Sequence, residues 1–226
     1  TVSGGSGQRN AANGIGFKLT VIISLVLLVV FAGKSTYDAA GDYSVEIADN
    51  IATTTAESQL LAAELERTFA EVYQTCLDLD SFVQHELNRP ASERSRERIV
   101  TALELLLKRN ATATGLSALF EPNAFDESDA RFANVGIYNA DGRFIPYAAK
   151  SGGTIQLSSV PFEGDTSGWY DKPLRTGQAN MVSPFRLGND IITTLAIPIT
   201  HNGKTLGVIN ADIDVTFLQT RLEKIP

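Results

Sequence analysis

The sequence predicts an α+β fold in which helices precede an antiparallel β-sheet. A stretch without proline, from about residue 35 to 88, repeats apolar residues at helical spacing. Short β-rich runs follow and are separated by turn sequences, most clearly at Asn202-Gly203. No Gly-rich phosphate loop, GxSxG or HExxH motif accompanies them, so the pattern favours a non-enzymatic protein.

Composition excludes several classes of function. The 226 residues carry a net charge of −7, which argues against a nucleic-acid surface. The basic cluster 89–98 also contains Glu93 and Glu97, and it is interpreted as a solvated helix start. Cys76 is the only cysteine and the two histidines lie far apart, so neither an intrachain disulfide nor a metal site is expected, and no cofactor is predicted.

The N-terminal part predicts a membrane anchor. Residues 1–16 are rich in Gly, Ser and Asn and are expected to form a flexible tail. Residues 17–34 are interpreted as a transmembrane helix, with the alternative of a cleaved signal peptide. Arg9 and Lys18 precede this segment and several acidic residues follow it, so the positive-inside rule places the remainder outside the cytoplasm, in the periplasm of a bacterium.

Residues 35–90 predict one long periplasmic helix that ends at Pro90. Its apolar stripe from Leu61 to Leu87 includes Cys76, which is expected to be a buried thiol. A helix of that length extends roughly 80 Å, about twice the diameter of one small domain, so either a stalk or a second module is expected beside it. Ser92 is predicted to cap a second helix that ends near Arg109.

The remaining chain predicts five or six antiparallel strands in two hairpins. The first strand is 115–120, and the acidic loop 121–129 after it is expected to be solvated. A hairpin is predicted between 134–138 and 143–148, followed by a covering loop at 151–165. A short helical piece is predicted to open at Gly168-Trp169-Tyr170 and to end at Gly177, before a strand at 181–185. A last helix is predicted at 216–224.

The Asn202-Gly203 turn predicts the register of the final hairpin. If the loop has two residues, the facing pairs are His201 with Lys204 and, farther along, Leu195 with Asn210 and Thr193 with Asp212. The far end of this face is then polar. A carboxylate there needs partners or water, so the patch is either a wall that contacts a ligand or the place where the strands emerge into solvent.

Several motifs together resemble a known family. They are FEPNAFDESDARF, YNADGRFIPY, GWYDKPLRTG and PITHNGKTLGVINADIDVTFLQ, in this order after the membrane segment and long helix. The chain thus resembles the double-Cache sensor region of bacterial methyl-accepting chemotaxis proteins, ending after its membrane-distal module. The resemblance implies a PAS-like sensor module at 91–226, a homodimer that signals across the membrane, and a membrane-proximal module beyond Pro226.

The resemblance also implies where a ligand binds. Trp169, Tyr170 and Asp212 match positions that contact ligand in the amino-acid-binding members. Ser167 stands where those members have a carboxylate-binding arginine, and Phe185 and Leu187 stand where Tyr and Asp are expected. An amine or another small solute, neutral or aromatic, therefore fits better than an α-amino acid. The candidate ligand-binding residues are Trp169, Tyr170, Asp212, Asn210, Thr193 and Tyr147.

Two other interpretations stay open. The same sensor module is compatible with a histidine kinase or a diguanylate cyclase as the output domain. The chain could instead form a membrane-tethered dimerisation module that binds no ligand. A sheet face without a cavity near Asp212 would favour that last interpretation.

Overall fold

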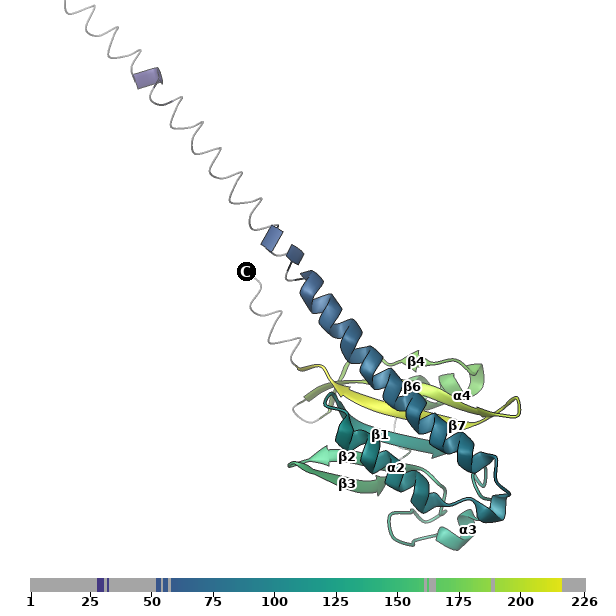
Figure 1. Ribbon diagram of the computed structural model, residues 1–226. Coiled ribbons are helices and arrows are strands. Elements are labelled where there is room, and N and C mark those ends of the chain that lie inside the picture. The colour runs from purple at the N-terminus through teal and green to yellow at the C-terminus, as the bar shows by residue number, and fades with distance from the viewer. Residues whose placement is uncertain are drawn as a thin grey trace, which may run out of the picture. The chain divides into compact units, whose positions relative to one another are not determined.

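A computed structural model describes residues 28–30, 32, 52–53, 55–56, 58–160, 162, 166–187 and 190–216 (Figure 1). The chain divides into two compact units, Thr1–Leu61 and Ala62–Pro226. In the first unit every described residue is helical. Most of the predicted membrane helix, much of the long helix before residue 58 and all but the first residue of the predicted last helix lie outside the described residues. Among the described residues, no helix has the length and apolar character that crossing a membrane requires.

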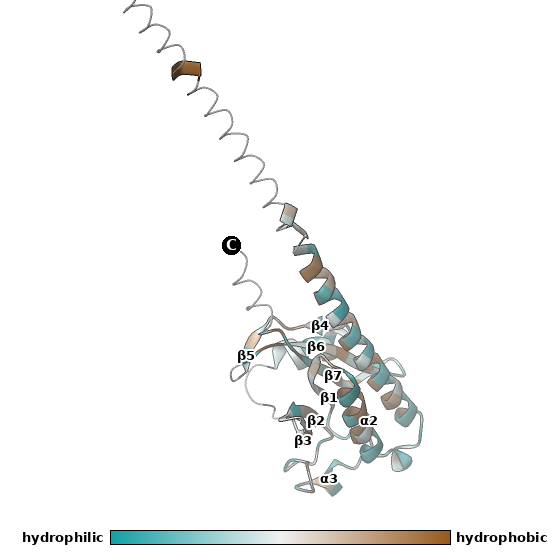
Figure 2. Ribbon diagram, turned by 60° about the vertical axis from the view of Figure 1, so that its left-hand side comes forward, coloured by the Kyte–Doolittle hydropathy of each residue, from teal (hydrophilic) through white to brown (hydrophobic). Residues whose placement is uncertain are grey.

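The second unit begins with a helix that continues to residue 87. Its apolar stripe is buried as predicted, including Val72, Cys76 and Leu79 at 0% exposure. Figure 2 shows hydrophilic and hydrophobic residues alternating along this helix, as expected for a helix with one buried face. The helix ends before Pro90, and a 3-10 turn, η1 (Ala91–Glu93), follows.

Helix α2 (Arg96–Arg109) packs beside the first helix on the same core. The side-chain oxygen of Ser95 accepts a hydrogen bond from the backbone N–H of Arg98 and caps the helix. The predicted cap, Ser92, is wrong because Ser92 lies inside η1. Asn110 ends the helix, and its side-chain oxygen accepts from the N–H groups of Thr112 and Ala113, which starts the first strand.

In the described part of the chain, seven strands form one antiparallel sheet. The strands are β1 (Ala113–Phe120), β2 (Pro146–Ser151), β3 (Thr154–Ser159), β4 (Asn180–Met181), β5 (Phe185–Leu187), β6 (Asp190–His201) and β7 (Lys204–Asp214). Their order is β3-β2-β1-β7-β6-β4, and β5 pairs with β6 beside β4. The longest strands, β6 and β7, therefore lie inside the sheet, which agrees with the predicted α+β class.

The predicted hairpin between 134–138 and 143–148 is wrong. Residues 134–138 form turns after the short helix α3 (Asp129–Phe132), and β2 pairs instead with β3. Gly152 and Gly153 join β2 to β3 with φ angles of 56° and 82°, a region that glycine enters without steric cost. The predicted covering loop 151–165 therefore starts as a strand, and only its later part leaves the sheet.

The predicted register of the last hairpin holds only next to the turn. His201 pairs with Lys204, but a β-bulge between Ile199 and Thr200 shifts every later pair by one residue. Asp212 therefore faces Thr194 instead of the predicted Thr193. A bulge inserts one unpaired residue, and because side chains alternate along a strand, this exchanges the two faces of β6 relative to β7.

The two faces of the sheet have different covers. The helix ending at residue 87 and α2 cover one face, where residues such as Leu116, Ala211 and Ile213 are completely buried (Figure 1). The other face carries a π-helical turn, η2 (Ser167–Asp171), and helix α4 (Lys172–Thr176). Helix α4 ends at Gly177 in a left-handed conformation, as the sequence predicted.

The basic cluster 89–98 is not a solvated helix start. Arg96, with its side chain 2% exposed, donates to Asp126 at 2.8 and 2.9 Å and to Asp129 at 2.5 Å. Its guanidinium also lies 4.1 Å from the Phe132 ring centroid. The acidic loop 121–129, predicted to be solvated, is thus held in place by a buried ion-pair cluster, because two carboxylates share one arginine.

Candidate functional site

A pocket opens on the sheet face opposite the two long helices, with a volume of about 180 Å³. Cross-strand pairs build its floor: Ser117 faces Asn210, and Gly115, Asp212 and Thr194 form a row across β1, β7 and β6. The lining residues are Ser117, Tyr147, Val160, Trp169, Phe185, Ile192, Thr194, Asn210 and Asp212. The pocket thus joins one carboxylate to several aromatic and aliphatic side chains.

Asp212 is the only charged residue among the described residues of that lining. Its carboxylate accepts hydrogen bonds from the Thr194 hydroxyl at 2.7 Å and from the Tyr147 hydroxyl at 2.9 Å. Burial raises the pKa of Asp212, and the hydrogen bonds from Thr194 and Tyr147 lower it by less. Within the described part of the chain, no Lys, Arg or His forms an ion pair with Asp212. A partly buried carboxylate without a cation is unusual and attracts one.

Tyr147 reaches Asp212 because Gly115 has no side chain. A Cβ atom at Gly115 would stand 2.8 Å from the Asp212 carboxylate oxygen and 2.8 Å from the Tyr147 ring. Real Cβ atoms do not approach other atoms so closely, so any larger residue would displace one of the two side chains. Gly115 therefore shapes the pocket floor, and the burial of the Tyr147 hydroxyl beside Asp212 raises the pKa of that tyrosine.

Asn210 connects the pocket floor to the η2 turn, which is the cover of the pocket. This residue is 6% exposed. In the amide orientation that satisfies its neighbours, the side-chain nitrogen donates to the Trp169 carbonyl oxygen at 2.9 Å. The η2 turn that carries Trp169 is thereby attached to β7, two residues from Asp212. Asn210 positions the indole as well as lining the pocket.

The structure brings together four of the six predicted site residues. Asp212, Asn210, Trp169 and Tyr147 line the same pocket. Thr193 does not, because the bulge turns it to the other face of β6, where its hydroxyl donates to the Val182 carbonyl at 2.6 Å. Thr194 takes the place predicted for Thr193.

Tyr170 also lies outside the pocket lining. It is 4% exposed, and its hydroxyl is bonded to Arg143 and Glu121. Trp169 and Tyr170 are neighbours on the helical turn η2, so their side chains leave it in different directions.

Sequence reasoning missed four of the lining residues: Ser117, Val160, Ile192 and Thr194. It placed Phe185 at a position where the amino-acid-binding members have a tyrosine, but did not include it among the candidates. Ser117 had a detectable signal, because it is the one polar residue in the middle of the predicted strand GLSALF. Val160 and Ile192 had none, since a single aliphatic residue near a strand end is compatible with either face.

The site is arranged for binding a small molecule. Among the described residues, no group of three His, Cys, Asp or Glu side chains is placed to hold a metal ion. The polar atoms that face the pocket belong to one carboxylate, two hydroxyl-bearing strand residues, one phenol and one amide. Such a set orients a ligand through hydrogen bonds and charge while the aromatic rings bury its apolar part.

Comparison with known proteins identifies the family. A sequence model for methyl-accepting chemotaxis protein-like first PDC sensor domains matches residues 99–220, more than half of the chain. The chain is 27% identical over 245 residues to the methyl-accepting chemotaxis protein TlpQ of Pseudomonas aeruginosa, an alignment that covers 93% of this chain. It covers 34% of TlpQ, so the chain spans about a third of that relative.

Solved structures share the fold. The extracellular domain of mmHK1S-Z3, described as a histidine kinase, has a TM-score of 0.57 at 25% identity, covering 70% of this chain and 55% of that one. The periplasmic sensory domain of the Campylobacter jejuni chemoreceptor Tlp1 has a TM-score of 0.54 at 15% identity, covering 72% and 60%. The predicted likeness to a chemoreceptor sensor is confirmed, and the family is not enzymatic. This chain belongs to the family of methyl-accepting chemotaxis protein-like first PDC sensor domains.

Proposed function

We propose that this chain is the extracytoplasmic sensor module of a transmembrane chemoreceptor and that its pocket binds a small organic cation. The observation that carries the proposal is Asp212: a partly buried carboxylate that faces a pocket and has no cationic partner among the described residues. An ammonium group would supply that partner, and its alkyl or aryl part would contact Trp169 and Phe185.

The lining also argues against an α-amino acid. Such a ligand presents a carboxylate beside its ammonium group, and a site for it needs a positive side chain or several donors. No Lys, Arg or His is among the described lining residues, and Ser167 does not line this pocket. The single negative charge of the site would repel the ligand carboxylate. An amine that lacks this group avoids the repulsion and keeps the hydrogen bonds to Asp212.

The proposal includes the organisation of the longer receptor. Residues 1–16 would be a tail, 17–34 a membrane helix, 35–90 a long helix and 91–226 the membrane-distal module of a double-Cache region in a homodimer. The periplasmic sensory domain of Tlp1 and the kinship with TlpQ support a chemotaxis output. The likeness to the extracellular domain of mmHK1S-Z3 supports a histidine kinase as the second candidate.

The test uses the 226-residue chain purified in detergent micelles. Butylammonium, 1-butanol and norvaline serve as probes because they separate the effects of the cation, the alkyl chain and the carboxylate. We expect butylammonium to raise the melting temperature and to bind in calorimetry, and the other two probes to have much smaller effects. Equal binding of 1-butanol, or tighter binding of norvaline than of the amine, would refute the proposed ligand class.

A further inference from the structure

A second polar cluster lies directly behind the pocket cover and is separate from Asp212. We name it the latch and define it as Glu121, Arg143 and Tyr170. Arg143 donates to the Glu121 carboxylate at 3.0 Å and to the Tyr170 hydroxyl, which in turn donates to Glu121. Arg143 also donates to the Phe120 carbonyl at 2.6 Å, which attaches the latch to the end of β1.

Aromatic contacts extend the latch toward the cover. The Arg143 guanidinium lies 4.5 Å from the Phe162 ring centroid and 5.4 Å from that of Tyr170. Phe162 in turn packs on Tyr170 at 4.8 Å and on Trp169 at 5.6 Å. The arginine side chain is only 14% exposed, so these contacts are largely shielded from water. One guanidinium thus joins the end of β1 to Phe162 and Tyr170, the two rings that pack against Trp169.

The η2 turn depends on such attachments. It has five residues and no side-chain cap at its N-terminus, so its own backbone hydrogen bonds hold it weakly. Its described attachments include the Asn210 amide on the Trp169 carbonyl, the Asn180 amide on the Gly168 carbonyl at 2.7 Å and the latch on the adjacent Tyr170. Between them, the Trp169 indole forms a wall shared by the Asp212 pocket and an outer cleft of about 570 Å³ lined in part by Lys172, Arg175 and Asn180.

We propose that Arg143 and Tyr170 are positioning residues for the ligand site: through the latch they fix the Trp169 indole as the partition between the Asp212 pocket and the outer cleft. Neither residue lines the pocket, so both would act through Trp169. A loosened latch lets the indole move into the cleft, which removes one wall of the pocket and lowers its affinity for any ligand that packs on this ring.

The test uses the fact that Trp169 is the only tryptophan of the chain. Its fluorescence therefore reports on the partition alone, without any ligand. Tyr170→Phe removes a single hydroxyl and keeps the ring. Because this hydroxyl bonds two charged side chains, we expect its loss to raise the open population of the turn roughly tenfold, and quenching of Trp169 by acrylamide to increase about twofold at temperatures well below unfolding.

Tyr138→Phe is the matched control, since the Tyr138 hydroxyl makes no hydrogen bond to the described residues and lies in the Arg96 cluster. A merely structural role for Tyr170 would lower the melting temperature and leave quenching in the folded state unchanged, and that result would overturn the proposal. Arg143→Lys is the second variant, because it keeps the charge and loses the forked geometry; it should increase quenching in the same way.

A further measurement rests on the proposed function. Binding of butylammonium to Tyr170→Phe is expected to weaken by about threefold to tenfold, in the range that lost preorganisation produces. If no variant binds the amine, the proposed ligand class fails while the quenching result still decides the latch. If the amine binds normally and quenching does not change, the latch proposal fails alone.

Discussion

Replacing Asp212 by Asn is expected to change ligand binding and stability in opposite directions. The substitution is nearly isosteric. Thr194 donates to one carboxylate oxygen and Tyr147 to the other, so asparagine keeps one of these acceptors, and the second hydroxyl must rotate to accept from the new NH2 group. It removes the negative charge from the pocket and leaves the volume of the side chain nearly unchanged. Any effect on a cationic ligand therefore reports the charge and not the shape of the site.

The magnitude follows from the contact that the carboxylate offers. Two opposite charges about 4 Å apart interact by roughly 4 kcal/mol at the effective dielectric of a partly exposed site. The asparagine oxygen still accepts a hydrogen bond from the ammonium group and replaces about half of that energy. The remaining loss of about 2 kcal/mol corresponds to a roughly 30-fold higher Kd for butylammonium.

The same substitution is expected to stabilise the ligand-free protein. The pKa of Asp212 is raised in the folded state, so the ionised carboxylate is less favourable there than in the unfolded chain. At neutral pH the folded state carries that disadvantage, and Asp212→Asn removes it. We expect the ligand-free variant to be at least as stable as the parent, and its melting temperature to rise by about 2–4 °C for each kcal/mol gained.

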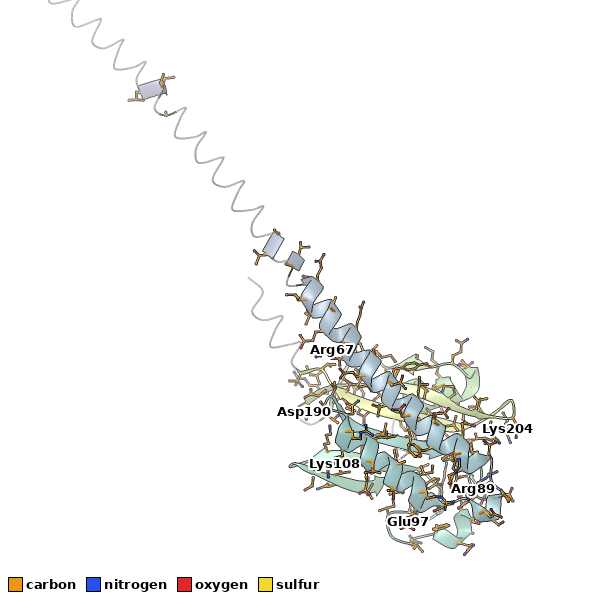
Figure 3. All side chains as sticks on the ribbon, in the orientation of Figure 1. Arg67, Arg89, Glu97, Lys108, Asp190 and Lys204 are labelled. Carbon is orange, nitrogen blue, oxygen red and sulfur yellow. The ribbon has the colours of Figure 1, made fainter. Side chains whose placement is uncertain are left out.

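Calorimetry with butylammonium and thermal unfolding without ligand measure the two effects. Asp190→Asn is the control, because Asp190 is exposed at the start of β6, at the opposite end of the β6–β7 hairpin from Lys204 (Figure 3). The reasoning is refuted if Asp212→Asn binds the amine as tightly as the parent. It is equally refuted if the ligand-free variant is much less stable, because the carboxylate would then be stabilising in the native state.

Four more outcomes are expected. Because the pKa of Asp212 is raised, its ionisation lowers the stability of the ligand-free fold as pH rises through that pKa; thermal unfolding between pH 4 and 7 should therefore show a stability gain on acidification that Asp212→Asn lacks. Gly115→Ala should displace Tyr147, costing about 1–3 kcal/mol of stability and weakening the amine more than 1-butanol in calorimetry. The Cys76 thiol, whose pKa burial and the charge of Asp212 raise to about 12, should react with a disulfide reagent only after unfolding. Arg96→Met should cost about 3–5 kcal/mol in denaturant unfolding, because it leaves two buried carboxylates unpaired.

Local signals predicted the local features of the fold. The apolar stripe gave the buried face of the helix, including Cys76, because helical periodicity needs no knowledge of distant partners. The Asn202-Gly203 turn and the end of α4 at Gly177 followed from backbone conformations that few residues adopt. Two predicted features position the candidate site: the Asn202-Gly203 turn joins the strands that carry Asp212 and Thr194, and the helical piece that ends at Gly177 carries Trp169.

Features that depend on distant partners were not predictable in this way. The register beyond the bulge depends on how β6 fits both β4 and β7, so Thr193 and Thr194 are indistinguishable from sequence. Arg96 looked solvated because its neighbours in sequence are charged, yet its partners lie about 30 residues later. The hairpin was assigned to the wrong strands because Asn139 to Gly142 is also a good turn sequence, and only pairing with β3 decides between them.

The two faces of strand β7 contact different parts of the molecule. Asp212 points into the pocket, while its neighbours Ala211 and Ile213 are packed beneath the helix that ends at residue 87. The charge of Asp212 also contributes to the raised pKa of the Cys76 thiol on that helix. A ligand that binds this carboxylate therefore acts on a strand whose opposite face packs against the helix. A shift of β7 at Asp212 is therefore also a shift of residues in the core beneath that helix.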